Sequence, residues 1–344
     1  MPFLSPTSTL LISTSFTTAY LGSIYLVPSA RVHLSPSSAA PPPASPSPPD
    51  ADLASAVPAP GQPPRDRNHP TVIKARLAAV SLASSASLAF VPFLLSTPQL
   101  LNVPHAYPTY AAAVPTSLKL LGLALPRSWK DAATLALVPL GLTASLFAGS
   151  FYVQTLAGEL PFQQGWKRGY KSWWGALKAK FDGWRGVRNY GLAPLTEEIT
   201  FRSCIIAISF LGGIDKSKLV FLSPLWFGLA HVHHAWDTYR TGGRTKAALQ
   251  QGIFQSAFQF VYTTVFGWYA AFLFLRTGSL LPPFLAHALC NALGLPPVGW
   301  ALQVYPEKKL SILASYAAGI AAFSYGLWRW TEPALYGGSM YWRV

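Results

Sequence analysis

Residues Pro194 to Gly213 form a mostly apolar segment with the sequence PLTEEITFRSCIIAISFLGG. It is long enough for a membrane helix, since about 20 mostly apolar residues span the hydrocarbon core of a bilayer. It nevertheless contains Glu197, Glu198 and Arg202. A charged side chain near the bilayer centre costs about 2.5–3.5 kcal/mol on insertion scales, so such residues are rare and usually functional. We therefore expect a membrane helix that contains residues of a functional site.

The composition of the whole chain is that of a membrane protein. Of its 344 residues, 51% are hydrophobic and 11% are charged, whereas soluble domains carry about 25% charged residues. The apolar runs are long and continuous, which favours helices over a transmembrane β-barrel. The net charge of +14 is typical of basic loops that face anionic lipid, and no nucleic-acid motif is present. The two cysteines, Cys204 and Cys290, are expected to be small buried residues.

The apolar runs predict an all-α, polytopic membrane bundle with about eight transmembrane helices. A further run, 109–125, is short and is interrupted by Pro115, so it is expected to be re-entrant or interfacial. The predicted spans are residues 8–27, 77–101, 132–153, 194–214, 219–236, 253–275, 279–296 and 310–330.

Five regions follow from the changes in composition along the chain. They are a first membrane helix (1–34), a Pro/Ala/Ser-rich disordered loop (35–70), N-terminal membrane helices (71–153), a basic and aromatic interfacial segment (154–193) and a catalytic membrane core (194–344). Proline denies hydrogen bonds to a helix, so the second region is expected to be extended. In the fourth region, Lys and Arg recur with Trp, Tyr and Phe at helical spacing, as in helices that lie in a membrane interface.

The basic residues also predict an orientation, because cytosolic loops of membrane proteins are enriched in Lys and Arg. Placing residues 154–193 in the cytosol puts most basic residues on that face and both termini on the other. Three polar clusters then fall in the cytosolic half of the bilayer: the two glutamates, His231, and His287 with Asn291. We therefore expect them to converge.

The spacing of these residues indicates a chemistry. Glu198 and Arg202 are separated by four residues, which favours an ion pair, and His287 and Asn291 share one helix face for the same reason. A glutamate beside a histidine can hold and deprotonate water, while a second histidine and an asparagine can donate to an oxyanion. This set predicts an amide hydrolase that uses water directly. On spacing alone, either glutamate could be the base.

Three motifs carry a family resemblance. Glu197 to Arg202 fits E-E-x-x-x-R, Phe227 to His231 fits F-x-x-x-H, and His287 to Asn291 fits H-x-x-x-N. In this order, on separate membrane helices, they resemble the three motifs of the type II CAAX prenyl endopeptidases. These form the Ras-converting enzyme branch of the CPBP (Abi) membrane protease family. The resemblance covers about residues 194–296.

The resemblance implies a multi-pass protease of the endoplasmic reticulum membrane whose active site faces the cytosol. It would remove the last three residues from prenylated proteins that end in Cys-a-a-X, such as small GTPases including Ras, without a metal or other cofactor. Its partners would be these proteins and membrane lipid, with no nucleic acid. The implied roles are water activation by Glu197 with His231, an oxyanion hole from His287 and Asn291, and support from Glu198 and Arg202.

Two other functions are open at this point. A zinc-dependent intramembrane metalloprotease could use a glutamate, His231 and His287 as ligands, although no H-E-x-x-H motif is present. A non-enzymatic transporter or scaffold could also bury Glu, His and Arg, but no inverted repeat supports it.

Overall fold

The computed structural model describes residues 4–30, 68–97, 107–160, 163, 173–230 and 233–342. Over these ranges the chain consists of helices and their connections, with no strand. The all-α prediction is therefore confirmed. The helices are α1 (Pro6–Leu26), α2 (Pro70–Leu95), α3 (Tyr110–Leu120), α4 (Trp129–Ser145), α5 (Ala148–Ala157), α7 (Trp173–Phe181), α8 (Gly183–Val187), α9 (Ala193–Glu198), α10 (Ile205–Leu211), α11 (Lys216–Leu222), α12 (Pro224–Ala230), α13 (His233–Thr241), α14 (Lys246–Thr277), α15 (Leu281–Leu293), α16 (Val298–Val304) and α17 (Lys309–Arg329).

Local sequence explains several of the helix ends. The hydroxyls of Ser5, Thr109 and Ser128 each accept a hydrogen bond from a backbone N–H in the first turn of α1, α3 and α4. Such N-caps satisfy donors that have no partner inside the helix. Helix α14 ends at Thr277 and is followed by Gly278, whose φ of 64° is the left-handed conformation that glycine adopts without steric cost.

The structure does not confirm eight membrane spans. Within the described residues, three helical segments are long and apolar enough to cross a membrane: α2, α14 and Pro306–Arg329. The pair α4–α5 makes a fourth if it counts as one span, but it bends by 71°. The segment expected as a single span at 219–236 is divided as well: α11 ends at Leu222, and Pro224, which begins α12, cannot donate a hydrogen bond to the preceding turn. Hydropathy measures apolar content and does not detect such breaks.

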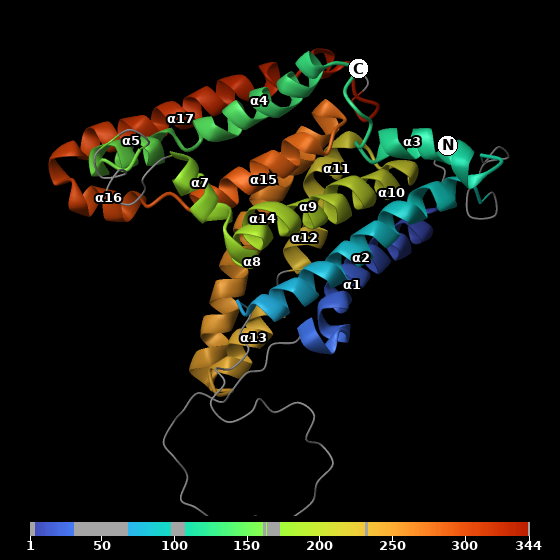
Figure 1. Cartoon of the computed structure of the whole chain (residues 1–344), viewed down its shortest axis with the longest axis horizontal. Coiled ribbons are helices and arrows are strands. Elements are labelled where there is room, and N and C mark those ends of the chain that lie inside the picture. The colour runs from blue at the N-terminus through green and yellow to red at the C-terminus, as the bar shows by residue number, and fades with distance from the viewer. Residues whose placement is uncertain are drawn as a thin grey trace, which may run out of the picture.

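The helix that carries the two glutamates lies at the centre of the molecule. Figure 1 shows α17 beside α4 and α5 on one side and α1 beside α2 on another, with α9, α10 and α15 between them. The central position is reflected in the core, where Phe201, Ile205, Ile206 and Ile208 are all fully buried. Helix α13 packs on the N-terminal part of α14 and extends with it away from the rest (Figure 1).

Large apolar side chains cover the outer faces of the long helices. In a soluble protein an apolar surface of this extent would be unfavourable, whereas lipid accommodates it. Together with the membrane-length helices, it makes this a multi-pass membrane protein. Examples on α1, α2, α4, α14 and α17 are Leu10, Leu82, Leu137, Phe254 and Leu310.

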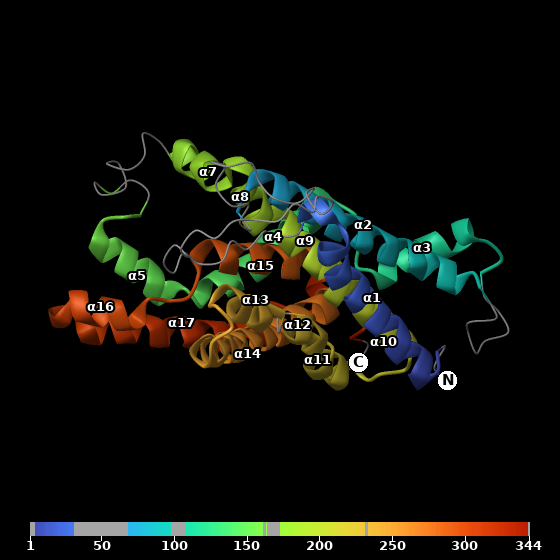
Figure 2. The same ribbon diagram turned by 90° about the horizontal axis from the view of Figure 1, so that it is seen from below.

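Two of the expected connecting regions are described only in part. Most of the proline-rich loop (35–70) lies outside the described residues. The basic and aromatic segment is described at 154–160, at 163 and from Trp173 onward. There, Lys180 Nζ donates to the carbonyl of Ala292 at 2.7 Å, and Lys74 Nζ lies 4.8 Å from the centre of the Trp184 ring. These contacts attach α7 and α8 to α15 and α2 (Figure 2). A location in the membrane interface stays a prediction.

Candidate active site

Glu198 lies fully buried between Arg202 and His287. Its side chain is 0% exposed, and its Oε1 lies 3.2 Å from Nη1 of Arg202, which is 1% exposed. The ion pair predicted from their spacing is therefore present. The same Oε1 accepts a hydrogen bond from Nδ1 of His287 at 2.7 Å. One carboxylate thus joins the E-E-x-x-x-R motif to the H-x-x-x-N motif, 89 residues further along the chain.

Aromatic rings complete the surroundings of Arg202. The guanidinium carbon lies 4.4 Å from the ring centre of Phe227 and 5.7 Å from that of Phe266. Ring faces attract cations, and the attraction is larger where water is excluded. The same two rings flank the imidazole of His287, with centre-to-centre distances of 6.1 and 5.0 Å. The rings and the ion pair together fix the position of His287.

Glu197, the neighbour of Glu198, is in a different environment. Its side chain is 21% exposed, and its Oε2 lies 3.6 Å from Nε2 of His287. The imidazole therefore lies between the two carboxylates, with Nδ1 on Glu198 and Nε2 toward Glu197. Because an ionised carboxylate can only accept hydrogen bonds, Nδ1 carries the proton in the bond to Glu198. Nε2 then faces the space beside Glu197.

The backbone around the glutamates is irregular. The π-helical segment η3 (Arg188–Leu192) precedes α9, and a second one, η4 (Ile199–Cys204), follows it. Single π-helical turns inside α-helices are rare and frequently occur at functional sites. Asn189 lies in η3, and its carbonyl accepts a hydrogen bond from Nδ2 of Asn291 at 2.9 Å. This bond holds the last residue of the H-x-x-x-N motif near the glutamate helix.

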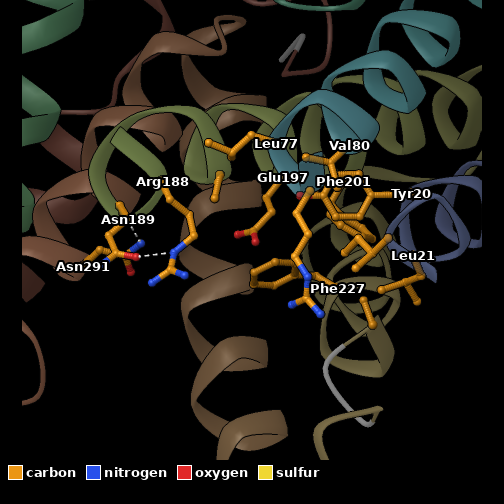
Figure 3. Close-up of a pocket in the computed structure, with 14 residues that line it drawn as sticks. Tyr20, Leu21, Leu77, Val80, Arg188, Asn189, Glu197, Phe201, Phe227 and Asn291 are labelled. Atoms are coloured by element: carbon orange, nitrogen blue, oxygen red, sulfur yellow. Dashed lines mark hydrogen bonds between the residues drawn. The ribbon is translucent and has the colours of Figure 1, made fainter. Parts of the chain in front are cut away.

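Two cavities meet at Glu197. One has a volume of about 370 Å³ and lies between α1, α2 and the glutamate helix, and the other has a volume of about 810 Å³ and lies between α4, α14 and α15. Both fall in the range of ligand-binding pockets. Figure 3 shows Glu197 pointing into the smaller one, with Arg188 and Asn291 on one side of it and Tyr20 on the other. Four residues line both cavities: Asn189, Glu197, Phe227 and Asn291.

The remaining predicted site residue, His231, lies outside the described residues. Phe227, which begins the same F-x-x-x-H motif, is buried, and its ring lies 5.2 Å from that of Phe201 beside the glutamates. The residues of this motif that are described therefore pack against the other two motifs. Among the described residues, no group of three His, Cys, Asp or Glu is arranged to hold a metal ion. The zinc alternative depends on His231, and it is not tested by this part of the chain.

Several residues of the site were not predicted from the sequence. Tyr20 of α1 lies 3.2 Å through its hydroxyl from Oγ1 of Thr196, and it lines the smaller cavity together with Arg76, Arg188 and Asn189. Arg188 and Asn189 were assigned to the interfacial segment because their neighbours are basic and aromatic. Cys290 was expected to be buried, but it is only partly so and lines the larger cavity, whereas Cys204 is fully buried.

Comparison with known proteins gives a consistent result. A family model described as Type II CAAX prenyl endopeptidase Rce1-like matches residues 180–293. The human protein CAAX prenyl protease 2 is 35% identical over 273 residues, which cover 79% of this chain and 75% of the human one. The chain belongs to the type II CAAX prenyl endopeptidase family. The match contains all three motifs, so the resemblance predicted from them is confirmed.

Other members of this endopeptidase family match over shorter regions. CAAX prenyl protease 2 of Arabidopsis thaliana is 38% identical over 154 residues, 44% of this chain and 46% of the plant protein. Probable CAAX prenyl protease 2 of Schizosaccharomyces pombe is 47% identical over 109 residues, 32% of this chain and 39% of the yeast protein. No solved structure is significantly similar to the chain. Membership of this family supports CAAX endopeptidase activity for the chain.

Proposed function

We propose that this protein is an intramembrane endopeptidase that removes the C-terminal tripeptide of prenylated CAAX proteins by direct attack of water, with Glu197 as the general base. The observation that carries the proposal is the position of Glu197. It is the partly exposed member of the glutamate pair, it lines both cavities, and it faces the Nε2 atom of a histidine held by the other member.

In the proposed reaction, a water molecule lies between Glu197 and Nε2 of His287, with His231 as a further partner. Glu197 takes a proton from the water as its oxygen attacks the carbonyl carbon of the peptide bond after the prenylated cysteine. The carbonyl electrons move to the oxygen and form an oxyanion. Glu197 then returns the proton to the leaving nitrogen, the C–N bond breaks, and the products are a carboxylate on the cysteine and a free tripeptide.

Asn291 and His287 are the proposed donors to the oxyanion, with His287 donating through Nε2 in the form of the imidazole that carries a proton on both nitrogens. The amide nitrogen of asparagine has two hydrogen atoms, and one of them is used in the bond to the Asn189 carbonyl. The second can be directed to the oxyanion without breaking that bond. Donors that are already oriented act where charge develops, and losing one such donor typically lowers kcat by about 10²–10³.

The two cavities suit the two ends of the substrate. The larger is lined mainly by apolar and aromatic residues of α14, α17 and the connection between α4 and α5, among them Phe147, Val265, Phe266, Tyr269 and Phe323. It would hold the prenyl chain, while the smaller would hold the tripeptide on the other side of Glu197. The basic segment before Glu197 supports a cytosolic active site, because cytosolic loops are rich in Lys and Arg. The membrane proposed is that of the endoplasmic reticulum. Small GTPases and other prenylated CAAX proteins would then reach the active site from the cytosol.

The proposal is tested by cleavage of a farnesylated CAAX peptide with the purified, full-length protein in liposomes. Glu197→Gln keeps the size of the side chain and removes the base, so cleavage should fall to background while the protein remains folded. Glu159→Gln, at an exposed position away from both cavities, is the matched control and should retain activity. Full activity of Glu197→Gln would exclude Glu197 as the base. Loss of activity with a zinc chelator, restored by zinc, would favour the metalloprotease instead.

A further inference from the structure

The smaller cavity contains a feature that the proposed chemistry at Glu197 does not use. Two arginines, Arg76 of α2 and Arg188 of η3, line it together with aliphatic side chains. Glu197 is the one acidic residue among the described residues that line this cavity. A tripeptide bound here would therefore meet two cations and an apolar wall formed by Leu21, Ile24, Leu77 and Val80.

Both guanidinium groups are held in place by the protein. Nε of Arg76 donates to the carbonyl of Ala30 at 2.8 Å. Nε of Arg188 donates to Oδ1 of Asn189 at 2.9 Å, and its Nη2 donates to Oδ1 of Asn68 at 3.2 Å. A guanidinium has five N–H donors in a planar fork, and this geometry matches the two oxygens of a carboxylate. Such fixed forks are suited to recognition of planar anions.

Arg188 is also connected to the reaction centre. Its neighbour Asn189 accepts from Arg188 through its side chain and from Asn291 through its backbone carbonyl. In Figure 3 the Arg188 side chain extends into the cavity on the Asn291 side of Glu197. A group bound at Arg188 is therefore positioned relative to both the proposed base and the proposed oxyanion donor.

An endopeptidase that releases a tripeptide must measure a fixed distance from the end of its substrate. Three residues span at most about 10–11 Å in an extended chain, so a site for the terminal carboxylate at that distance from the base would set the cut. We propose that Arg76 and Arg188 bind the C-terminal α-carboxylate of the substrate, and that the aliphatic side chains that line the same cavity bind the two side chains that precede it. This inference rests on the proposed function, and it adds a physical reason why cleavage occurs three residues from the C-terminus.

The test compares two farnesylated peptides that differ only at the C-terminus, one with a free carboxylate and one with a carboxamide. In neutral phosphatidylcholine liposomes, the wild-type protein should cleave the acid with a kcat/KM about 10- to 100-fold higher than that for the amide. The reason is that only the acid can accept hydrogen bonds as a charged group. Most of the difference should be in KM. In Arg76→Gln, Arg188→Gln and the double variant, the ratio of acid to amide should fall toward one. Arg185→Gln, an exposed arginine three residues before Arg188, should keep the wild-type ratio.

A second pair of substrates measures the distance directly. A peptide with one extra residue after X moves the carboxylate out of reach, so the wild-type protein should cleave it poorly. The double variant should discriminate less between this peptide and the normal one, as judged by mass spectrometry of the released peptide.

The remaining outcomes distinguish a carboxylate site from a structural or lipid-binding role of the two arginines. Equal cleavage of acid and amide by the wild-type protein would overturn the carboxylate site, while inactivity of Glu197→Gln would still support the proposed function. A loss of activity in the arginine variants with an unchanged acid-to-amide ratio would show that the arginines are only structural. If the variants instead lose a stimulation by anionic lipid and keep the ratio, the arginines bind lipid phosphate and the inference is wrong. If the wild-type protein cleaves no farnesylated peptide, the proposed function fails, and this inference fails with it.

Discussion

Replacing Glu198 by glutamine tests whether the buried ion pair supports the site. The side chain keeps its size, but Arg202 loses its negative partner in a place where both groups are at most 1% exposed. Removing one member of a buried pair leaves an uncompensated charge and costs about 3–5 kcal/mol. We expect the free energy of unfolding to fall by this amount. Because His287 also loses its anionic acceptor, kcat should fall by about 10²–10⁴.

The assay is thermal unfolding of the purified protein in detergent, together with cleavage of the farnesylated peptide. Glu332→Gln is the matched control, because Glu332 forms an ion pair with Arg276 at the shorter distance of 2.9 Å but is 51% exposed. Arg276 also donates to the carbonyls of Thr331 and Trp328 and keeps these partners in the variant. The free energy of unfolding of Glu332→Gln should therefore fall by at most about 1 kcal/mol.

The double variant Glu198→Gln/Arg202→Met separates stability from catalysis. It removes both charges, so it should regain most of the lost stability and remain inactive. If Glu198→Gln were as stable as the wild type, or if the double variant recovered activity along with stability, the supporting role of the pair would be refuted.

Two further predictions concern single positions. Asn291→Ala should lower kcat by about 10²–10³ with little change in KM, as expected for an oxyanion donor. The control variant Gln303→Ala on α16 should have no effect. A change confined to the KM of Asn291→Ala would contradict the role of Asn291 as an oxyanion donor. Gly267→Ala should destabilise the protein by about 1–3 kcal/mol, because a Cβ there would lie 2.6 Å from Cβ of Pro224 and 3.3 Å from Nη2 of Arg202. Gly141→Ala in α4, with no atom within 4 Å of a built Cβ, should instead stabilise it by up to about 1 kcal/mol, and thermal unfolding distinguishes the two.

The sequence was sufficient for the helical class and for the pairing of neighbours on one helix. The ion pair of Glu198 and Arg202 follows from helical spacing alone, because residues four apart lie on one face whatever the surroundings. The convergence of His287 on the glutamates was predicted from depth in the membrane, and the 2.7 Å bond to Glu198 agrees with it. These successes concern relations that helix geometry and the bilayer impose.

The parts that could not be predicted depend on tertiary packing. Hydropathy treated 132–153 as one span, but α4 and α5 meet at 71°, and an average over apolar residues contains no information about such a bend. Arg76 and Arg188 come from different helices; Arg188 lies in a basic and aromatic stretch, and Arg76 lies near Lys74 at the start of an apolar run. Only the fold brings them to one cavity. A cation that binds substrate and a cation that faces lipid headgroups have the same local sequence signal.

The two adjacent glutamates illustrate how the fold gives identical side chains different environments. Successive residues on a helix point about 100° apart, so Glu197 and Glu198 cannot both face the same space. Glu198 is turned into the core, where Arg202 and His287 compensate its charge. Glu197 is turned toward the cavities, where it can exchange a proton with water. Spacing left the identity of the base open, whereas burial distinguishes the two glutamates: Glu198 is 0% exposed and is not among the residues that line the two cavities, while Glu197 lines both. The Glu197→Gln and Glu198→Gln variants should therefore differ in kind: the first is inactive and stable, whereas the second is destabilised and has a lower kcat because His287 has lost its anionic acceptor.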